Sequence, residues 1–177
     1  AFINCEFGYC NAPIYIGGNG DRVENCTFHD IEWDLLSNGA SGTVILRNDA
    51  TFVRNTVCRT GNSEGVRPLG HGARVELTHL YDTGNLQHDG AAINAGTRNH
   101  IQTVVARNWA HDCNRQGVRF DYHGTKMLRE DGKIHGDGVY MRNVSWRTQP
   151  NQVKGDRHLI LNNTVVSVNH CPDPATE

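Results

Sequence analysis

The chain has 177 residues, enough for one domain, with 37% hydrophobic residues, 19 glycines and a formal net charge of −2 at pH 7. This near-neutral balance of mixed charges disfavours nucleic acid and anionic membranes as partners, and no apolar run is long enough to span a membrane. A chain so poor in apolar residues is either disordered or a turn-rich β solenoid, and the regular spacing of its β-branched runs favours the solenoid.

Seven short hydrophobic strands, each built around an Asn or a Thr, recur along the chain. They lie at residues 2–7, 23–28, 53–57, 75–80, 106–110, 141–145 and 161–165. Their anchors are Asn4, Asn25, Asn55, Thr78, Asn108, Asn143 and Asn163, at spacings of 21, 30, 23, 30, 35 and 20 residues. A bare coil of a β-helix needs roughly 20 to 24 residues. The pattern therefore predicts an all-β fold, a right-handed parallel β-helix of about seven coils with loop insertions, as one domain over residues 1–177.

We expect the seven anchors to form one inward ladder, because equal positions in successive coils lie about 4.8 Å apart. An inward Asn can donate its amide to a carbonyl of the next coil. Cys5 and Cys26 share one position in adjacent coils, which predicts either a disulfide or two stacked thiols. The chain opens in mid-repeat and looks like a fragment of a longer helix, so its end coils invite contact with further chain or with another copy.

A second series of strands follows, at residues 13–17, 65–69, 90–94, 117–121 and 152–156. Alternation predicts one outward row formed by Arg67, Ala92, Arg119 and Lys154. The next outward row is expected to contain Leu69, Asn94, Asp121 and Asp156. Insertions within 33–43, 86–89 and 122–138 are expected to wall this surface, because loops beside one strand of a solenoid usually build its binding groove.

The Asn-ladder strands, together with segments 53–61 and 88–93, resemble the pectate-lyase-like superfamily of right-handed β-helix proteins over essentially the whole chain. That superfamily includes polysaccharide lyases, glycoside hydrolases, carbohydrate epimerases, phage tailspikes and non-enzymatic surface proteins. The fold alone therefore does not select a reaction. The resemblance implies a polysaccharide substrate and a secreted protein, extracellular or periplasmic.

The cationic row indicates an acidic polysaccharide. Arg67 and Arg119 could each bind a carboxylate through two hydrogen bonds, and Lys154 could supply a point charge. Lyases of this fold, to which the sequence is similar, use Lys or Arg as base and acid. A β-elimination would then have Lys154 as base and Arg119 as acid. The alternative is a solvated, ion-paired strand face.

Two carboxylates give a rival hypothesis. If the register holds, Asp121 and Asp156 lie in neighbouring coils about 5 Å apart, close to the separation in a retaining glycosidase. The alternative is a charge lattice that pairs Arg119 with Asp121 and Lys154 with Asp156. A non-catalytic solenoid that binds glycan or protein is the third hypothesis, and it is favoured if the outward charges are paired and no groove is present.

Histidine completes the candidate site, because an imidazole beside a groove can act as a general acid or hydrogen-bond donor. The candidate catalytic residues are Lys154, Arg119, Asp121, Asp156 and His88, and the candidate substrate-binding residues are Arg67, Asp89, Asn94 and His123. The carboxylates of Asp30, Glu32 and Asp34 could hold calcium, as in β-helix lyases, although a solvated edge is the preferred interpretation. No His or Cys spacing matches zinc.

Overall fold

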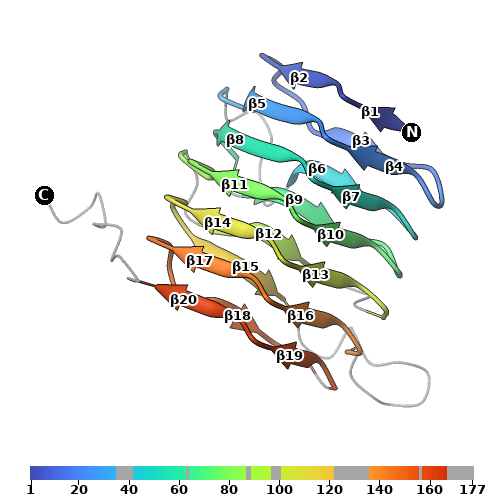
Figure 1. The fold of residues 1–177 in the computed structure, drawn as a ribbon. Helices are drawn as coiled ribbons and strands as arrows, with labels where there is room; N and C mark the ends of the chain where they lie inside the picture. Colours follow the sequence, from blue (N-terminus) through green and yellow to red (C-terminus); the bar gives the residue numbers. More distant parts are fainter. Residues whose placement is uncertain are drawn as a thin grey trace, which may run out of the picture.

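The computed structural model describes residues 1–34, 42–62, 64–86, 89–96, 101–121, 136–155 and 157–166. These ranges contain twenty β-strands and no helix. The strands form three sheets, which we name A, B and C, and every pairing within them is parallel between successive coils. The all-β parallel β-helix predicted from the sequence is therefore confirmed, with seven coils in sheets A and B (Figure 1).

Short strands alternate between sheets A and B along the chain, with a sheet C strand in most coils. Sheet A comprises β1 (Phe2–Ile3), β4 (Arg22–Glu24), β7 (Thr51–Val53), β10 (Arg74–Glu76), β13 (Val104–Ala106), β16 (Val139–Met141) and β19 (Leu159–Leu161). Sheet B comprises β2 (Glu6–Gly8), β5 (Thr27–Ile31), β8 (Thr56–Thr60), β11 (His79–Tyr81), β14 (Trp109–His111), β17 (Val144–Trp146) and β20 (Thr164–Val166). Sheet C comprises β3 (Ile14–Ile16), β6 (Gly42–Leu46), β9 (Glu64–Pro68), β12 (Ala91–Ala95), β15 (Gln116–Phe120) and β18 (Gln152–Val153).

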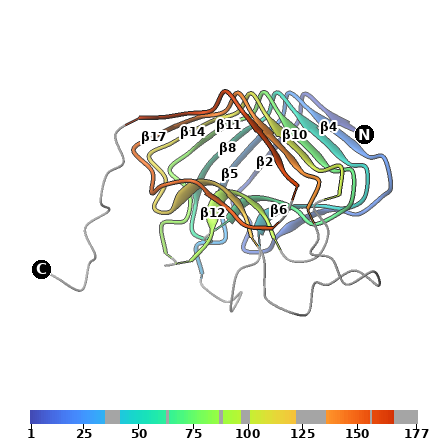
Figure 2. The same cartoon turned by 90° about the horizontal axis from the view of Figure 1, so that it is seen from below.

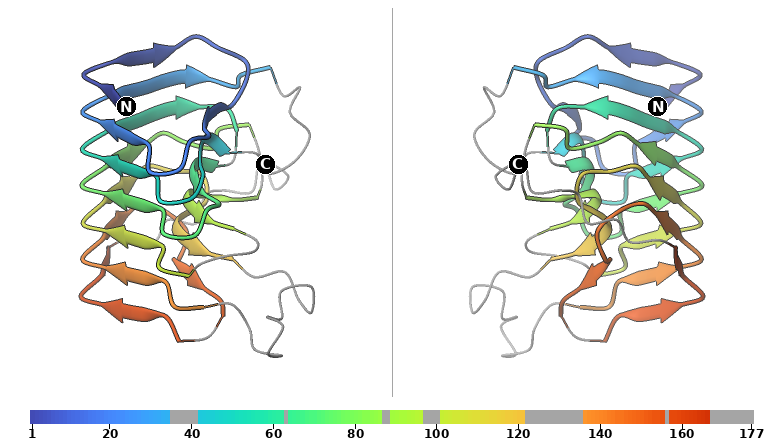
Figure 3. Two further views of the ribbon diagram at one scale, coloured as in Figure 1. Left: turned by 90° about the vertical axis from the view of Figure 1, so that its right-hand side faces the viewer. Right: turned by 90° about the vertical axis from the view of Figure 1, so that its left-hand side faces the viewer.

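Sheets A and B form one broad side of the stack, and sheet C lies across the core from them (Figure 2). The strands of successive coils stand directly over one another (Figure 3). The described ranges contain no helix that is long and apolar enough to cross a membrane.

The core runs along the axis of the helix as ladders of equivalent apolar side chains. Phe7 and Phe28 stack with ring centroids 4.8 Å apart, and Phe28 lies 5.3 Å from Phe52. Phe28 and Phe52 are fully buried. Burial of one such side chain is worth about 2 to 3 kcal/mol, so the ladder is a principal source of stability in the first coils.

The corner between sheets A and B repeats one backbone conformation in every coil. Its residues have φ between 51° and 57° and are Asn4, Asn25, Arg54, Leu77, Arg107, Arg142 and Asn162. The next residue in each coil points inward and forms the ladder, which consists of Cys5, Cys26, Asn55, Thr78, Asn108, Asn143 and Asn163. Asn143 shows its bonding: Oδ1 accepts the backbone N–H of Asn108 at 3.0 Å, and Nδ2 donates to the carbonyl of Val105 at 2.9 Å.

The expected ladder was wrong by one residue in its first two coils. Val23 pairs with Phe52, which places Cys26, and not Asn25, opposite Asn55. Asn4 and Asn25 occupy the left-handed corner instead, a conformation that Asn tolerates better than most residues. Cys5 and Cys26 are free thiols, and the backbone N–H of Cys5 donates to Sγ of Cys26 at 3.4 Å. Of the two alternatives for this pair, stacked thiols are confirmed and the disulfide is not formed.

Candidate functional site

The strands of sheet C bend in such a way that two consecutive residues face the core. Ala92 and Ile93 of β12 both belong to the core. In β9, a Cβ on Gly65 would meet Leu80 and Thr83 and lie only 2.7 Å from the carbonyl oxygen of Ala92. Gly65 therefore faces inward beside Val66, and the strict alternation expected from the sequence fails at this point.

This bend brings Glu64 and Arg67 onto the same outer face of sheet C. Nε of Arg67 lies 3.1 Å from Oε2 of Glu64, and Nδ2 of Asn94 donates a short hydrogen bond to Oε1 of Glu64. The Glu64 side chain is 0% exposed and that of Arg67 is 16% exposed. A carboxyl group is thus buried beneath the outer face of the sheet, in contact with one cation and one amide.

The outward row itself differs from the expected one. From coil to coil, the observed row consists of Ile45, Arg67, Asn94, Arg119 and Gln152. Ala92, expected to point outward, belongs to the core. Arg67 and Arg119 do share the row, with Asn94 between them, but Lys154 lies two residues beyond its expected place. The bend explains the inward position of Ala92, whereas the place of Lys154 reflects an expected register that was wrong by two residues.

Lys154 stacks instead on Asp121. Its backbone N–H donates to the carbonyl of Phe120 at 2.8 Å, and its Nζ lies 2.8 Å from Oδ1 of Asp121. The other carboxylate oxygen of Asp121 accepts Nη2 of Arg119 at 2.6 Å, and Nη1 of the same guanidinium donates to Asp89 at 2.6 Å. Arg119 therefore joins a buried aspartate to Asp89, whose side chain is 75% exposed.

The environments of two carboxyl groups push their pKa values apart. Burial raises the pKa of Glu64 to about 7, against the opposing effects of Arg67 and Asn94. The pKa of Asp89 is lowered. Partial desolvation by itself would raise this pKa, but the hydrogen bond and the positive charge of Arg119 lower it by more. The negative charge of Asp89 also helps to raise the pKa of Glu64. Two carboxyl groups separated in this way are the usual arrangement of an acid and a base in an active site.

We define the sheet C network as Glu64, Arg67, Asp89, Asn94, Arg119, Asp121 and Lys154. Within the described ranges, buried polar atoms without a hydrogen-bond partner include Asn94 Oδ1 and Arg119 Nε, both in this network. Such atoms are rare in folded proteins, and a ligand's hydroxyl or carboxylate group can satisfy them. Their concentration in one place marks the network as the candidate site.

The structure brings together six of the nine sequence-predicted site residues: Lys154, Arg119, Asp121, Arg67, Asp89 and Asn94. The other three, His88, His123 and Asp156, lie outside the described residues, as do most residues of the three expected insertions. The Asp121–Asp156 hypothesis therefore stays a prediction. Glu64 was missed by sequence reasoning. The available signal was a carboxylate directly before Gly65 at the start of an apolar strand.

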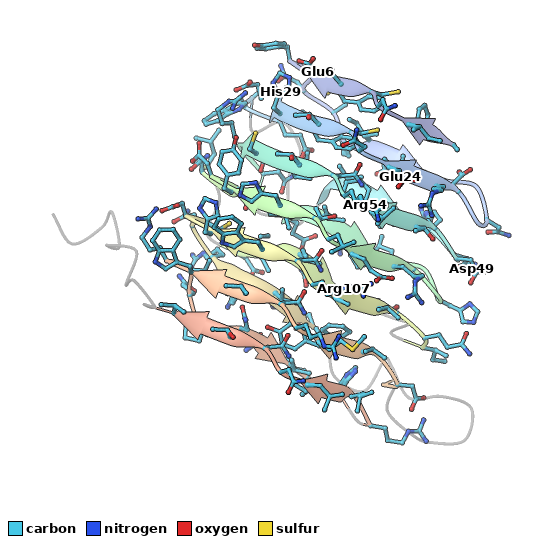
Figure 4. All side chains as sticks on the ribbon, viewed as in Figure 1. Glu6, Glu24, His29, Asp49, Arg54 and Arg107 are labelled. Carbon is cyan, nitrogen blue, oxygen red and sulfur yellow. The ribbon has the colours of Figure 1, made fainter. Side chains whose placement is uncertain are left out.

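Other charged groups are paired on the outside of the stack. On sheet A, Glu24 accepts hydrogen bonds from Arg22 at 2.8 Å and from Arg54 at 2.7 Å (Figure 4). At the end of sheet B, His29 contacts Glu6 and Asp30, each at 2.7 Å. We interpret these as structural pairs at the surface of the stack, although the His29 side chain itself is buried.

The carboxylates considered for calcium do not converge. Asp30 accepts hydrogen bonds from Arg59 and contacts His29, whereas Glu32 is buried and accepts a hydrogen bond from Thr43 at 3.3 Å. In the described part of the chain, no group of three or more His, Cys, Asp or Glu side chains is placed to hold a metal ion.

Comparison with known proteins adds no family to this description. No protein-family model matches the chain, and no curated protein and no solved structure matches it either.

Proposed function

We propose that the chain is a carbohydrate-active β-helix protein of the pectate-lyase-like superfamily, which cleaves an acidic polysaccharide outside the cytoplasm. The observation that carries the proposal is the buried carboxyl of Glu64, with a pKa of about 7, among the cations of the sheet C network. The network contains three cations, Arg67, Arg119 and Lys154, and Glu64 carries its full negative charge only when the pH rises above about 7. A uronic acid carboxylate is the ligand that such a group of Arg and Lys side chains would bind.

The first proposed reaction is β-elimination. It needs cations that neutralise the substrate carboxylate, a base for the proton on the adjacent carbon, and an acid for the leaving oxygen. Nζ of Lys154 donates to Oδ1 of Asp121, so Lys154 serves better as acid than as base. Its side chain is 38% exposed, so a sugar chain lying over sheet C could contact it. We assign the base to Glu64, since a carboxyl with a pKa of about 7 is substantially ionised at neutral pH.

Access to Glu64 requires one movement. Because Glu64 is fully buried against Arg67, we propose that the Arg67 guanidinium turns to the substrate carboxylate when the sugar chain binds. Glu64 is then uncovered and takes the proton, a C=C bond forms as the C–O bond breaks, and the leaving oxygen takes a proton from Lys154. Arg119 stays between its two aspartates and holds Asp89 and Asp121 in place.

The second candidate is glycoside hydrolysis, and the separation of the Glu64 and Asp89 pKa values favours it. Glu64 would protonate the glycosidic oxygen, and the ionised, exposed Asp89 would act as base or nucleophile on the opposite side. The originally expected pair, Asp121 and Asp156, remains an alternative for the same reaction. The pairing of Lys154 with Asp121 favours the third hypothesis, a non-catalytic glycan-binding face.

One assay separates the three. Wild type is incubated with a panel of acidic and neutral polysaccharides, and both the ultraviolet absorbance of unsaturated products and new reducing ends are measured. A lyase produces both signals, a hydrolase only reducing ends, and a binding protein neither, although it is retained on an immobilised acidic polysaccharide.

Three variants assign the residues. Glu64→Gln should reduce either activity by at least about 100-fold, as loss of a general acid or base does. Asp89→Asn should do the same only for hydrolysis. Glu24→Gln, on sheet A, is the matched control and should keep wild-type activity. Full activity in Glu64→Gln would place the site elsewhere, and a wild type that neither binds nor cleaves any acidic polysaccharide would overturn the proposal.

A further inference from the structure

A cluster of aromatic and imidazole side chains lies on the outer face of sheet B, on different strands from the sheet C network. It contains His79 and Tyr81 of β11, Trp109 and His111 of β14, and Trp146 of β17. His79 stacks on Trp109 with ring centroids 4.9 Å apart, and Tyr81 stacks on His111 at 5.5 Å. Each imidazole therefore packs against an aromatic ring of the neighbouring coil, where the fourth and fifth coils meet.

The two imidazoles also contact each other directly. Their Nε2 atoms lie 2.8 Å apart, with ring centroids 5.0 Å apart, so the rings of His79 and His111 meet head-on in an N–H···N hydrogen bond. In such a bond one Nε2 carries the hydrogen and the other accepts it with its lone pair. The contact therefore requires one protonated and one unprotonated Nε2.

The two imidazoles have different charged neighbours. Nδ1 of His111 lies 2.5 Å from Oδ2 of Asp112, whereas His111 is the only polar side-chain partner of His79 among the residues that the structure describes. The guanidinium of Arg147 binds Asp112, and this hydrogen bond is the main reason why the pKa of Asp112 is lowered. Asp112 therefore stays ionised in a mildly acidic medium and favours a positive charge on His111 over one on His79.

The second imidazole resists a charge of its own. Burial lowers the pKa of His79 below its ordinary value of 6.5, and the positive charge of His111 lowers it further. The first proton that the pair gains therefore belongs on His111, whose Nδ1–H and Nε2–H then donate to Asp112 and to Nε2 of His79. A second proton has to go to that same Nε2 of His79. Two N–H groups and two positive charges then face each other, and no hydrogen bond joins the rings.

We propose that the His79–His111 contact is an acid-sensitive link between the fourth and fifth coils, which is closed while the pair carries at most one positive charge and opens when both imidazoles are charged. His79 is the ring that moves, because His111 stays bound to Asp112 and stacked on Tyr81. Its departure uncovers the indole face of Trp109 on which it stacks. The outer face of sheet B thus presents a different surface in an acidic medium.

The groups on the β8 side of the pair keep their charge in this range of pH. The residue that pairs with His79 there is Thr56, which does not titrate. Beside it, Cys58 and Arg59 form hydrogen bonds with Tyr81, and the bond to Cys58 is the main reason why the pKa of Tyr81 is raised. A thiol, a phenol and a guanidinium take up no proton on mild acidification. Titration on this side therefore belongs to the imidazole.

The groups on the other side compensate one positive charge and not two. Trp146 pairs with His111 across β14 and β17, and the guanidinium of Arg147 lies 4.0 Å from the centroid of its ring. In the corner that follows sheet B, the backbone N–H of Asp82 donates to the carbonyl of Asp112 at 3.1 Å. Two carboxylates and one guanidinium leave a single negative charge at this corner. It stabilises the first imidazolium and leaves the second without a counter-charge.

Nuclear magnetic resonance of the ¹⁵N-labelled full chain tests the link without any substitution. An N–H···N hydrogen bond transmits a scalar coupling between its two nitrogens, so a coupling between the Nε2 atoms of His79 and His111 reports the contact directly. It should be present at pH 7 and disappear as pH falls through the titration of His79, whose midpoint should lie below 6.5. The indole N–H signal of Trp109 should shift with the same midpoint, because the imidazole leaves its face.

Variants make the result specific. His111→Gln removes the facing charge, so the midpoint of His79 should rise toward 6.5. His79→Gln should abolish the pH response of Trp109. His71→Gln is the matched control, since His71 is 41% exposed and lies 4.0 Å from Asp49, and it should leave both titrations unchanged. Circular dichroism checks that each variant is folded.

The sign of the effect on stability follows from the same titration. The folded chain binds the second proton less tightly than the unfolded chain does, because the pKa of His79 is lowered on folding. The stability that the link contributes is therefore fully present above pH 6.5 and is lost as pH falls below it. His79→Gln should unfold with a weaker dependence on pH in this range.

Four results would each overturn the link. Two concern the coupling in the wild type: its absence at pH 7, or its persistence when both imidazoles are protonated. The third is a Trp109 signal that stays in place while His79 takes up its proton. The fourth is a midpoint of His79 that does not rise in His111→Gln.

Discussion

Lys154 and Asp121 form an ion pair between neighbouring coils, with Nζ of the lysine 2.8 Å from Oδ1 of the aspartate. The aspartate side chain is only 3% exposed, and Arg119 holds its other oxygen. Two cations from two coils therefore compensate one buried carboxylate. Removal of the partner of a buried charge lowers the free energy of unfolding by more than the intact ion pair contributes, because the remaining charge stays buried without compensation.

The first prediction concerns this triad. Lys154→Met should lower the free energy of unfolding by about 1 kcal/mol, because Lys154 is partly solvated and Asp121 keeps Arg119. Asp121→Asn should cost about 3 kcal/mol, because the buried Arg119 loses a charge partner. Arg157→Met is the control, since Arg157 and Asp137 are both well exposed, and should change little. Urea denaturation measures all three, and equal losses would contradict the argument.

The second prediction follows from the raised pKa of Glu64, about 7 in the folded chain against 4.5 as its ordinary value. The folded state holds this proton more tightly than the unfolded state, so stability is fully present below pH 4.5 and is lost as pH rises through 7. The loss should be about 3 kcal/mol. Urea denaturation of wild type and of Glu64→Gln is measured at several pH values from 4.5 to 8. The change with pH in the difference between their free energies of unfolding isolates the contribution of Glu64. Parallel curves for the two proteins would show that Glu64 ionises normally.

The third prediction separates the inward ladder from the corner. Asn143→Ala removes the partners of the Asn108 N–H and the Val105 carbonyl inside the core, and should cost about 3 kcal/mol. Asn4→Gly changes an exposed corner residue with φ of 56°, which glycine adopts freely, and should cost less than about 0.5 kcal/mol. Thermal unfolding compares the two. A large loss of thermal stability in Asn4→Gly would instead indicate that Asn4 points inward, as the sequence predicts.

The fourth prediction concerns the end coils. Phe2 of β1 is 45% exposed and Ile160 of β19 is 52% exposed, and among the strands that the structure describes, β1 and β19 each have a neighbour on one side only. Such edges pair with other chains, so we expect concentration-dependent self-association in sedimentation velocity. Phe2→Lys combined with Ile160→Lys should abolish it, whereas Leu77→Lys, at an exposed corner in mid-stack, should not. A wild type that stays monomeric at high concentration would rule it out.

The coil pattern could be predicted because the period of the apolar runs is imposed by the fold itself. The predicted strand at residues 53–57 is in fact divided by the corner between β7 and β8, because Arg54 has φ of 56° and interrupts the extended backbone. The two ladder errors have a shared cause. Asn suits both the inward ladder and the left-handed corner, so the dipeptide Asn25–Cys26 fits the pattern in two registers, and only the pairing of Val23 with Phe52 decides between them.

The candidate site could be predicted only in part. Arg67 and Arg119 lie in one row as expected, because each follows an inward valine and precedes an inward residue. Asn94 and Lys154 were misplaced because the expected register between coils was wrong by two residues, a shift that keeps the face but changes the neighbour. Ala92 was misplaced because two consecutive inward residues, Ala92 and Ile93, break strict alternation. That bend depends on the carbonyl of the neighbouring coil approaching Gly65, a tertiary contact that one strand's sequence does not encode.

Each strand of sheets A, B and C pairs only with the equivalent strands of adjacent coils. Evolution can therefore change the length of this protein in whole units. Deletion of the segment from Asn55 to Leu77 would place Thr78 next to Cys26, and these two residues already occupy equivalent positions in their coils. Duplication of a coil would create contacts between coils of the same kind as those already present. Insertion or deletion of one whole coil is thus a mild mutation here, whereas a shift of one residue inside a strand turns the remaining side chains of that strand to the opposite face.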